Sequence, residues 1–290
     1  MLTDLNGVLM PAKENGYAVG LFNVVNSEMA RGVISAAKEL GSPLIIGTAE
    51  RFLDFVPLSD LADILIPMAK RADIPVVIHF DHGKTKENCL KAIDCGFTSI
   101  MYDCSRLPYE ENVKNMADIV KIAHERGVTV EGELGAVMDL EGSIEGEPDS
   151  LSGRPEDYYT DPDVAYDFVK RTGVDALAVS VGNAHGAYKF PPKLDFDRID
   201  AINKKLSIPL VLHGGSGLTD EDFRRAISLG IAKVNIFTDI NEAAAKAAAA
   251  FLKNNPKNYA GTLNGVENAV KVCTREKLKL FMSENKGEIK

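Results

Sequence analysis

The chain is short of positive charge, and this shortage excludes one class of partner. Its 290 residues carry 33 Lys and Arg against 42 Asp and Glu, a formal net charge of −9 at pH 7. Binding along a nucleic-acid backbone needs a basic surface, so we expect no nucleic-acid partner. An anionic small molecule would have to be captured locally, by backbone N–H groups and a few placed cations.

Paired cysteines and long apolar runs are also lacking. No two of the four cysteines (Cys89, Cys95, Cys104 and Cys273) have the CxxC spacing, and we interpret them as reduced thiols packed as small apolar residues. The longest apolar stretches are strand-sized, and the first residues do not form a charged segment followed by an apolar run. These features predict a soluble, cytoplasmic protein with no membrane partner.

Eight short β-branched runs alternate with amphipathic helix patterns along the chain. Each run is almost continuously apolar, which is typical of strands buried on both faces of a parallel sheet. Eight strand–helix units favour a closed (β/α)8 barrel over an open sheet. An open dinucleotide-binding sheet would need GxGxxG after its first strand, where this chain reads FNVVNSE. The expected strands are 17–24, 42–49, 75–82, 99–105, 128–135, 176–186, 209–217 and 233–239.

The chain shows no break in composition and no Pro/Ser-rich linker. We therefore expect residues 1–290 to form a single α/β domain with the (β/α)8 TIM-barrel architecture. Two segments exceed the barrel: a polar stretch over about 136–160, which predicts a long loop after the fifth strand, and extra C-terminal helices ending with a helical region over about 262–285. Loops of this length are uncommon unless they are functional.

Histidine is scarce, and three of the five histidines end an apolar strand. They are His82, His185 and His213. Because the carboxyl ends of barrel strands form the active-site face, the fold would bring these distant residues together. Three neutral imidazoles commonly hold Zn²⁺ while leaving a fourth position open. We therefore predict a metal site at these residues and interpret His79 and His124 as structural.

Two carboxylates accompany the histidines at strand ends. Asp81 either orients the neighbouring ligand or acts as a general acid/base next to the metal. Glu133 is either a ligand for a second or alternate metal position or an ion-pair partner inside the barrel. The sequence does not decide between these two roles.

The seventh and eighth strands are followed by groups suited to an anion. Glycines there let backbone N–H groups approach a ligand, and the phosphate site of such barrels typically follows these two strands. The candidate phosphate-binding residues are Gly186, Lys189, Gly214, Gly215, Ser216, Asn235 and Thr238.

Six segments together resemble one enzyme family, the class II, metal-dependent fructose-bisphosphate aldolases, in particular the branch that includes tagatose-bisphosphate aldolases. The resemblance covers about residues 15–285. The segments are HFDHG (79–83), FTSIMYDCSRLPYEENV (97–113), VEGELG (130–135), TGVDALAVSVGNAHGAYK (172–189), PLVLHGGSG (209–217) and KVNIFTD (233–239).

The resemblance implies a zinc-dependent lyase of carbohydrate metabolism and glycolysis. It would reversibly cleave a ketose phosphate, first of all fructose 1,6-bisphosphate, to dihydroxyacetone phosphate and an aldehyde such as glyceraldehyde 3-phosphate. Tagatose 1,6-bisphosphate and other ketose phosphates are the alternatives. A monovalent cation such as Na⁺ or K⁺ and a homodimeric or homotetrameric assembly are also implied.

The resemblance also implies roles for individual residues. The three strand-end histidines would bind Zn²⁺, Asp81 would be the acid/base at the C4 hydroxyl, and Glu133 would be an extra carboxylate near the metal. Glu141 would be the loop glutamate that exchanges a proton on the three-carbon donor. The chain departs from the family pattern in AVMDLEG after ELG, and its late region offers only Arg275 as a candidate for a distal phosphate. The phosphate of dihydroxyacetone phosphate would be held by Gly186, Gly214, Ser216, Asn235 and Thr238.

Three competing functions differ in their requirements. A Schiff-base aldolase needs a desolvated lysine at a strand end, whereas Lys233 lies at the start of the eighth strand. A metal-dependent hydrolase barrel would carry HxH on the first strand, which here reads GLFNVVN. A sugar-phosphate-binding regulatory barrel without turnover stays open, because a fold does not guarantee activity.

Overall fold

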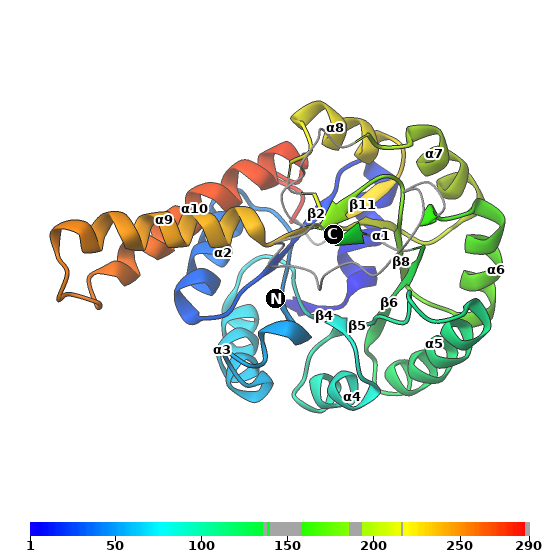
Figure 1. The fold of residues 1–290 in the computed structure, drawn as a ribbon, viewed down its shortest axis with the longest axis horizontal. Helices are drawn as coiled ribbons and strands as arrows, with labels where there is room; N and C mark the ends of the chain where they lie inside the picture. The colour runs from blue at the N-terminus through cyan, green and yellow to red at the C-terminus, as the bar shows by residue number, and fades with distance from the viewer. Residues whose placement is uncertain (136–137, 140–157, 186–192, 216, 288–290) are drawn as a thin grey trace.

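Eight parallel strands close into a barrel in the computed structural model (Figure 1), which describes residues 1–135, 138–139, 158–185, 193–215 and 217–287. The strands are paired in the order β4-β3-β2-β11-β10-β8-β6-β5, and β5 pairs with β4 to complete the ring. This confirms the predicted TIM barrel. The barrel strands are β2 (Val19–Asn23), β3 (Leu44–Ala49), β4 (Val76–Gly83), β5 (Ser99–Tyr102), β6 (Thr129–Leu134), β8 (Ala176–Val179), β10 (Leu210–Leu212) and β11 (Ile231–Ile236).

Helices surround the barrel on the outside (Figure 1). Polar side chains fix where many of them begin: the side chains of Asn26, Thr85, Asp161, Asp195 and Thr219 each accept a hydrogen bond from a backbone N–H in the first turn. The outer elements are α2 (Ser27–Glu39), the 3-10 helix η1 (Glu50–Phe52), α3 (Leu58–Arg71), α4 (Lys86–Asp94), α5 (Tyr109–His124), α6 (Pro162–Thr172), α7 (Phe196–Lys205) and α8 (Asp220–Ser228).

The N-terminal segment, which the sequence analysis did not assign, covers one end of the barrel. A short strand, β1 (Leu2–Thr3), pairs with the start of β4, and α1 (Leu5–Asn15) follows it. The buried face of α1 forms one apolar cluster with aliphatic side chains near the starts of the strands, such as Val77 and Val211. Apolar packing therefore fills the amino-terminal end of the barrel.

Beyond this apolar layer, toward the carboxyl ends of the strands, polar side chains line the barrel interior. Successive residues of a strand point to opposite faces, so residues two apart share the barrel interior. Three strands each carry two polar residues two positions apart. Five of these six side chains are buried, and Asn235 is partly exposed. The six residues are His79 and Asp81 on β4, Glu131 and Glu133 on β6, and Lys233 and Asn235 on β11. The carboxyl half of the barrel interior is thus polar and ionisable.

The predicted C-terminal helices are present. Helices α9 (Thr238–Asn254) and α10 (Thr262–Leu280) pack against each other, and their hairpin extends away from the barrel, while α10 also packs along α2 (Figure 1). Of the predicted loop over 136–160, the described part includes β7 (Met138–Asp139), which pairs with β9 (Ala184–His185). Within the described residues, none of the helices combines the length and the apolar character that crossing a membrane requires.

A close approach between two strands makes one glycine essential to the barrel. A Cβ at Gly47 would lie 1.9 Å from the carbonyl oxygen of His79. We expect Gly47→Ala to lower the free energy of unfolding by about 3 kcal/mol, the upper end of the usual cost of overpacking. Gly265→Ala is the matched control, because α10 leaves open space there and alanine favours a helix by about 1 kcal/mol. Urea unfolding of both variants measures this, and an unchanged midpoint for Gly47→Ala would contradict it.

Candidate active site

His82 lies at a distorted strand end. Its φ is 45°, a conformation uncommon for a residue other than glycine, and the register between β4 and β5 shifts between Phe80 and Gly83. Such bulges redirect side chains, and backbone strain of this kind concentrates at functional sites. The strained backbone at His82 therefore sets the direction in which this imidazole points.

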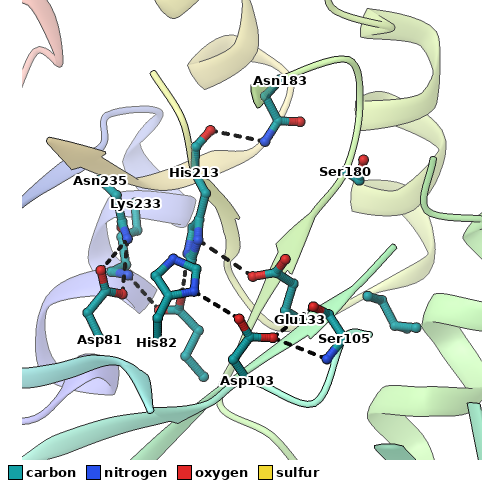
Figure 2. Close-up of polar contacts among 12 residues, drawn as sticks. Asp81, His82, Asp103, Ser105, Glu133, Ser180, Asn183, His213, Lys233 and Asn235 are labelled. Carbon is teal, nitrogen blue, oxygen red and sulfur yellow. Dashed lines mark hydrogen bonds and ion pairs between the residues drawn. The ribbon is translucent and has the colours of Figure 1, made fainter. Parts of the chain in front are cut away.

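His82 and His213 are brought together from β4 and the end of β10, as predicted. Their ring centroids are 4.6 Å apart (Figure 2). Nδ1 of His82 lies 3.0 Å from Oδ2 of Asp103, and Oδ1 of the same carboxylate accepts hydrogen bonds from the backbone N–H and the hydroxyl of Ser105. Because Nδ1 is engaged, Nε2 is the nitrogen of His82 that would coordinate a metal.

His213 is held in the complementary way. Its Nε2 lies 2.8 Å from Oε1 of Glu131, and its Nδ1 lies 3.6 Å from Oε2 of Glu133. Burial, the largest influence, and the charge of His82 lower the pKa of His213 to about 4, although the hydrogen bond with Glu131 opposes this. The imidazole is neutral near pH 7, the form that binds metal ions.

Four carboxylates lie around the two rings: Asp81, Asp103, Glu131 and Glu133. Burial raises the pKa of Glu133 well above its usual value, and the negative charge of Asp103 adds to this effect. Burial lowers the pKa of His82, but the charges of Asp81 and Asp103 outweigh it and raise the pKa to about 10. The site therefore concentrates negative charge that a bound cation would neutralise.

The donor atoms fit a divalent metal ion. One ligand atom from each of Asp81, His82 and His213 lies within 4.8 Å of the other two, and the same holds for His82, Asp103 and Glu133. Imidazole nitrogen with carboxylate oxygen is a donor set that zinc accepts. His185 lies in β9, of which the backbone alone is described, so the position of the third predicted imidazole stays a prediction.

Asp81 is held in place by two asparagines. Nδ2 of Asn23 lies 2.8 Å from Oδ2, and Nδ2 of Asn235 lies 3.1 and 3.2 Å from the two carboxylate oxygens. Burial alone would raise the pKa of Asp81, but the charge of His82 and the nearby His79 ring hold it well below its usual value. Asn235, predicted at the phosphate, contacts the predicted acid/base through its side chain and also lines the neighbouring pocket, so its role at a phosphate stays a prediction.

The remaining predicted residues divide into four groups. Gly214 and Gly215 directly follow His213, and Gly214 has φ 62°, which favours glycine. Thr238 begins α9, where helix N–H groups point outward and suit an anion. Arg275 lies on α10 and forms an ion pair with Glu39 at the end of α2, so the structure does not bring it to the histidines. Outside the described residues lie Glu141, Gly186, Lys189 and Ser216.

A small, partly open pocket lies beside Asp81 and His82. It is the place where the structure offers a ligand contact with the expected acid/base. Its other lining residues are Asn23, Ala49, Arg51, Phe52, Gly214, Asn235, Ile236 and Phe237.

Several residues of the site were not anticipated from the sequence. Asp103, Glu131 and Asn23 contact the predicted residues directly, and Lys233 is fully buried in the barrel interior, 2.7 Å from Oε2 of Glu131. His79, interpreted as structural, lies 3.7 Å from Asp81 through its Nε2. The missed signal was the two-residue spacing of polar side chains within apolar strands, as in HFD, EGE and KVN.

Comparison with known proteins supplies the family. The family model described as fructose-bisphosphate aldolase class-II matches residues 3–286. The uncharacterized protein YdjI of Escherichia coli is 40% identical over 288 residues, covering 99% of this chain and all of the relative. A fructose-bisphosphate aldolase of Staphylococcus aureus is 38% identical and covers 99% of both chains.

A solved structure agrees with this assignment. The crystal structure of the YdjI aldolase from Escherichia coli superposes with a TM-score of 0.88 at 39% identity, covering 99% of this chain and 100% of that one. The fold and the sequence match over nearly the whole chain therefore support the same family. The protein belongs to the class II fructose-bisphosphate aldolase family and is an aldolase, a carbon–carbon lyase.

Proposed function

We propose that this aldolase is zinc-dependent and reversibly cleaves a ketose phosphate to dihydroxyacetone phosphate and an aldehyde. Fructose 1,6-bisphosphate is the first candidate substrate, and tagatose 1,6-bisphosphate or another ketose phosphate is the alternative. The observation that carries the proposal is the approach of His82 to His213 at 4.6 Å with Asp81 beside them. His82 Nε2 and His213 Nδ1, with His185, would hold the ion, and Glu133 would supply a further oxygen ligand.

The chain's own residues account for the proton transfers. Asp81, held by Asn23 and Asn235, accepts the C4 hydroxyl proton as the C3–C4 bond breaks and returns it during condensation. Bond cleavage leaves an enediolate, whose negative charge a divalent ion bound at the histidines would stabilise by its Lewis acidity. Glu141 would then donate the proton to the three-carbon product.

We assign phosphate binding to groups that follow the carboxyl ends of β10 and β11. The backbone N–H groups after β10, at Gly214 and Gly215, and the start of α9 at Thr238 would hold the phosphate of dihydroxyacetone phosphate. Gly186, Lys189 and Ser216 belong to the same proposed site, with a monovalent cation such as Na⁺ or K⁺ near it. We also propose a cytoplasmic homodimer or homotetramer; the projecting α9–α10 hairpin, where Tyr259 is 74% exposed, is suited to subunit contact.

A product screen tests the reaction. Dihydroxyacetone phosphate is incubated with a panel of aldehydes, with and without chelator, and condensation products are identified. We expect products only without chelator, and restoration by Zn²⁺. Turnover that survives chelation, or trapping of a covalent adduct by borohydride, would overturn the metal assignment; bound zinc without turnover of any phosphorylated ketose would favour the regulatory barrel.

Arg51 gives a prediction about the aldehyde half of the substrate. It is a cation lining the pocket next to Asp81, with its guanidinium 5.5 Å from the Phe52 ring centroid. Hydrogen bonds to charged groups contribute about 1.5–3 kcal/mol, so we expect Arg51→Met to raise KM about 10- to 100-fold for aldehydes carrying phosphate or carboxylate. Neutral aldehydes serve as the control and should keep their KM. Equal losses for both classes would contradict a specific anion contact.

A further inference from the structure

A buried ion pair lies beneath the histidines, in the barrel interior. Lys233 on β11 and Glu131 on β6 are both 0% exposed, and Nζ lies 2.7 Å from Oε2. Removing two charges from water is costly, and apolar residues of similar volume often stabilise a core as well or better. Fold stability alone therefore does not account for a lysine and a glutamate at these positions.

The pair continues into the site through the other oxygen of Glu131. Oε1 lies 2.8 Å from Nε2 of His213. A carboxylate only accepts hydrogen bonds, so the Nε2–H group donates and the proton of the neutral ring resides on Nε2. The remaining nitrogen, Nδ1, then faces Glu133 and the other donor atoms of the candidate metal site.

A second histidine, His79, lies near the same carboxylate. Nε2 of His79 lies 3.9 Å from Oε2 of Glu131 and 3.7 Å from Oδ1 of Asp81, while Nδ1 lies 2.7 Å from the hydroxyl of Ser99. Glu131 is thus fixed from two sides, by Lys233 at one oxygen and His213 at the other. A carboxylate held in this way cannot rotate without breaking a buried contact.

We propose that Lys233 and Glu131 are positioning residues that lock His213 in the Nε2–H tautomer and aim its Nδ1 at the metal. Lys233 acts through Glu131 by orienting its carboxylate, and not as an amine nucleophile. This inference rests on the proposed function, because Nδ1 of His213 would coordinate the proposed divalent ion. Partners that orient metal-binding histidines in this way contribute about 10- to 100-fold to metal affinity.

The tautomer of His213 is the most direct measurement. In metal-free protein labelled with ¹⁵N at histidine, long-range ¹H–¹⁵N correlation spectra distinguish the two neutral tautomers. We expect native His213 to show the Nε2–H form alone, and the double variant Glu131→Gln/Lys233→Met to show a mixture. A native ring protonated at Nδ1, or a double variant with the native tautomer alone, would overturn the proposal.

The double variant is chosen because either single change leaves one buried charge without its partner and can unfold the barrel. Removing both charges avoids this problem, and Gln keeps the shape of Glu131. Metal affinity, measured by competition with a chromophoric chelator, should fall about 10- to 100-fold in the folded double variant. Native affinity in that variant would mean that the pair serves the fold only.

Ser42→Ala provides the matched control for a change in stability. Ser42 and Ser283 are 0% exposed and share a 2.8 Å hydrogen bond away from the histidines. We expect this variant to lower the melting temperature while leaving the tautomer and metal affinity unchanged. The tautomer is read without metal, so a native protein that binds no zinc would refute the proposed function separately from the positioning of His213.

Discussion

Replacing Asp81 with Asn should lower kcat about 1,000-fold while leaving the protein folded and loaded with metal. An amide has the shape of the carboxylate and can still accept hydrogen bonds from Asn23 and Asn235, but it cannot take up the C4 hydroxyl proton. General acid–base catalysis contributes about 10²–10⁴ in rate, which sets the expected loss. Steady-state cleavage and metal analysis on the same sample measure both quantities.

Two outcomes would contradict the role given to Asp81. A kcat within tenfold of the native value at full metal content would assign the proton transfer to another group. Loss of the metal itself would make Asp81 a ligand, since its carboxylate lies within 4.8 Å of the histidine nitrogens. Asp60→Asn on the outer helix α3 is the control for an unspecific effect of removing a carboxylate, and we expect native kcat there.

Metal affinity should rise steeply with pH. In the metal-free site the pKa of His82 is about 10 and that of His213 about 4, so between these values His82 carries a proton that a metal ion must displace. Each pH unit gained then strengthens binding about tenfold, and affinity rises about 100-fold between pH 6 and 8. If Glu133, whose pKa is also raised, becomes a ligand, the slope steepens further.

Chelator competition at three pH values measures this slope, and calorimetry in buffers of different ionisation enthalpy counts the protons released. Affinity independent of pH would mean that His82 is already neutral in the metal-free protein. His124→Gln is the control, because His124 pairs with Asp175 on the outside of the barrel and takes no part in the site. The slope should be the same in that variant.

The barrel was predictable because its strands are nearly continuous apolar runs, yet the strand ends were not. The expected strands at 176–186 and 209–217 end in the structure at Val179 and Leu212. Small or apolar residues such as Ser180, Val181 and Gly214 continue beyond those strand ends, so composition does not show where strand pairing stops. The α1 segment was missed for a related reason, since its contact with the barrel end depends on closure of the whole ring.

The site followed the same division. His82, His213 and Asp81 could be singled out because polar residues at the ends of apolar strands are visible in the sequence, and the structure places them close together. Asp103 and Glu131 were missed because their roles depend on which side chain faces them across the barrel. Arg51 was missed because it lies outside the sheet, on η1, where the sequence shows only an ordinary surface charge.

The position of Arg51 has a consequence for engineering. The groups assigned to bond breaking belong to rigid strand ends, whereas Arg51 and Phe52 belong to the short η1 turn above them. Directed evolution confined to residues 50–53 should therefore change the preferred aldehyde, for instance from charged to neutral. The strand-end residues assigned to bond formation would stay unchanged. Such a library would offer a route to new stereodefined sugars from a single parent catalyst.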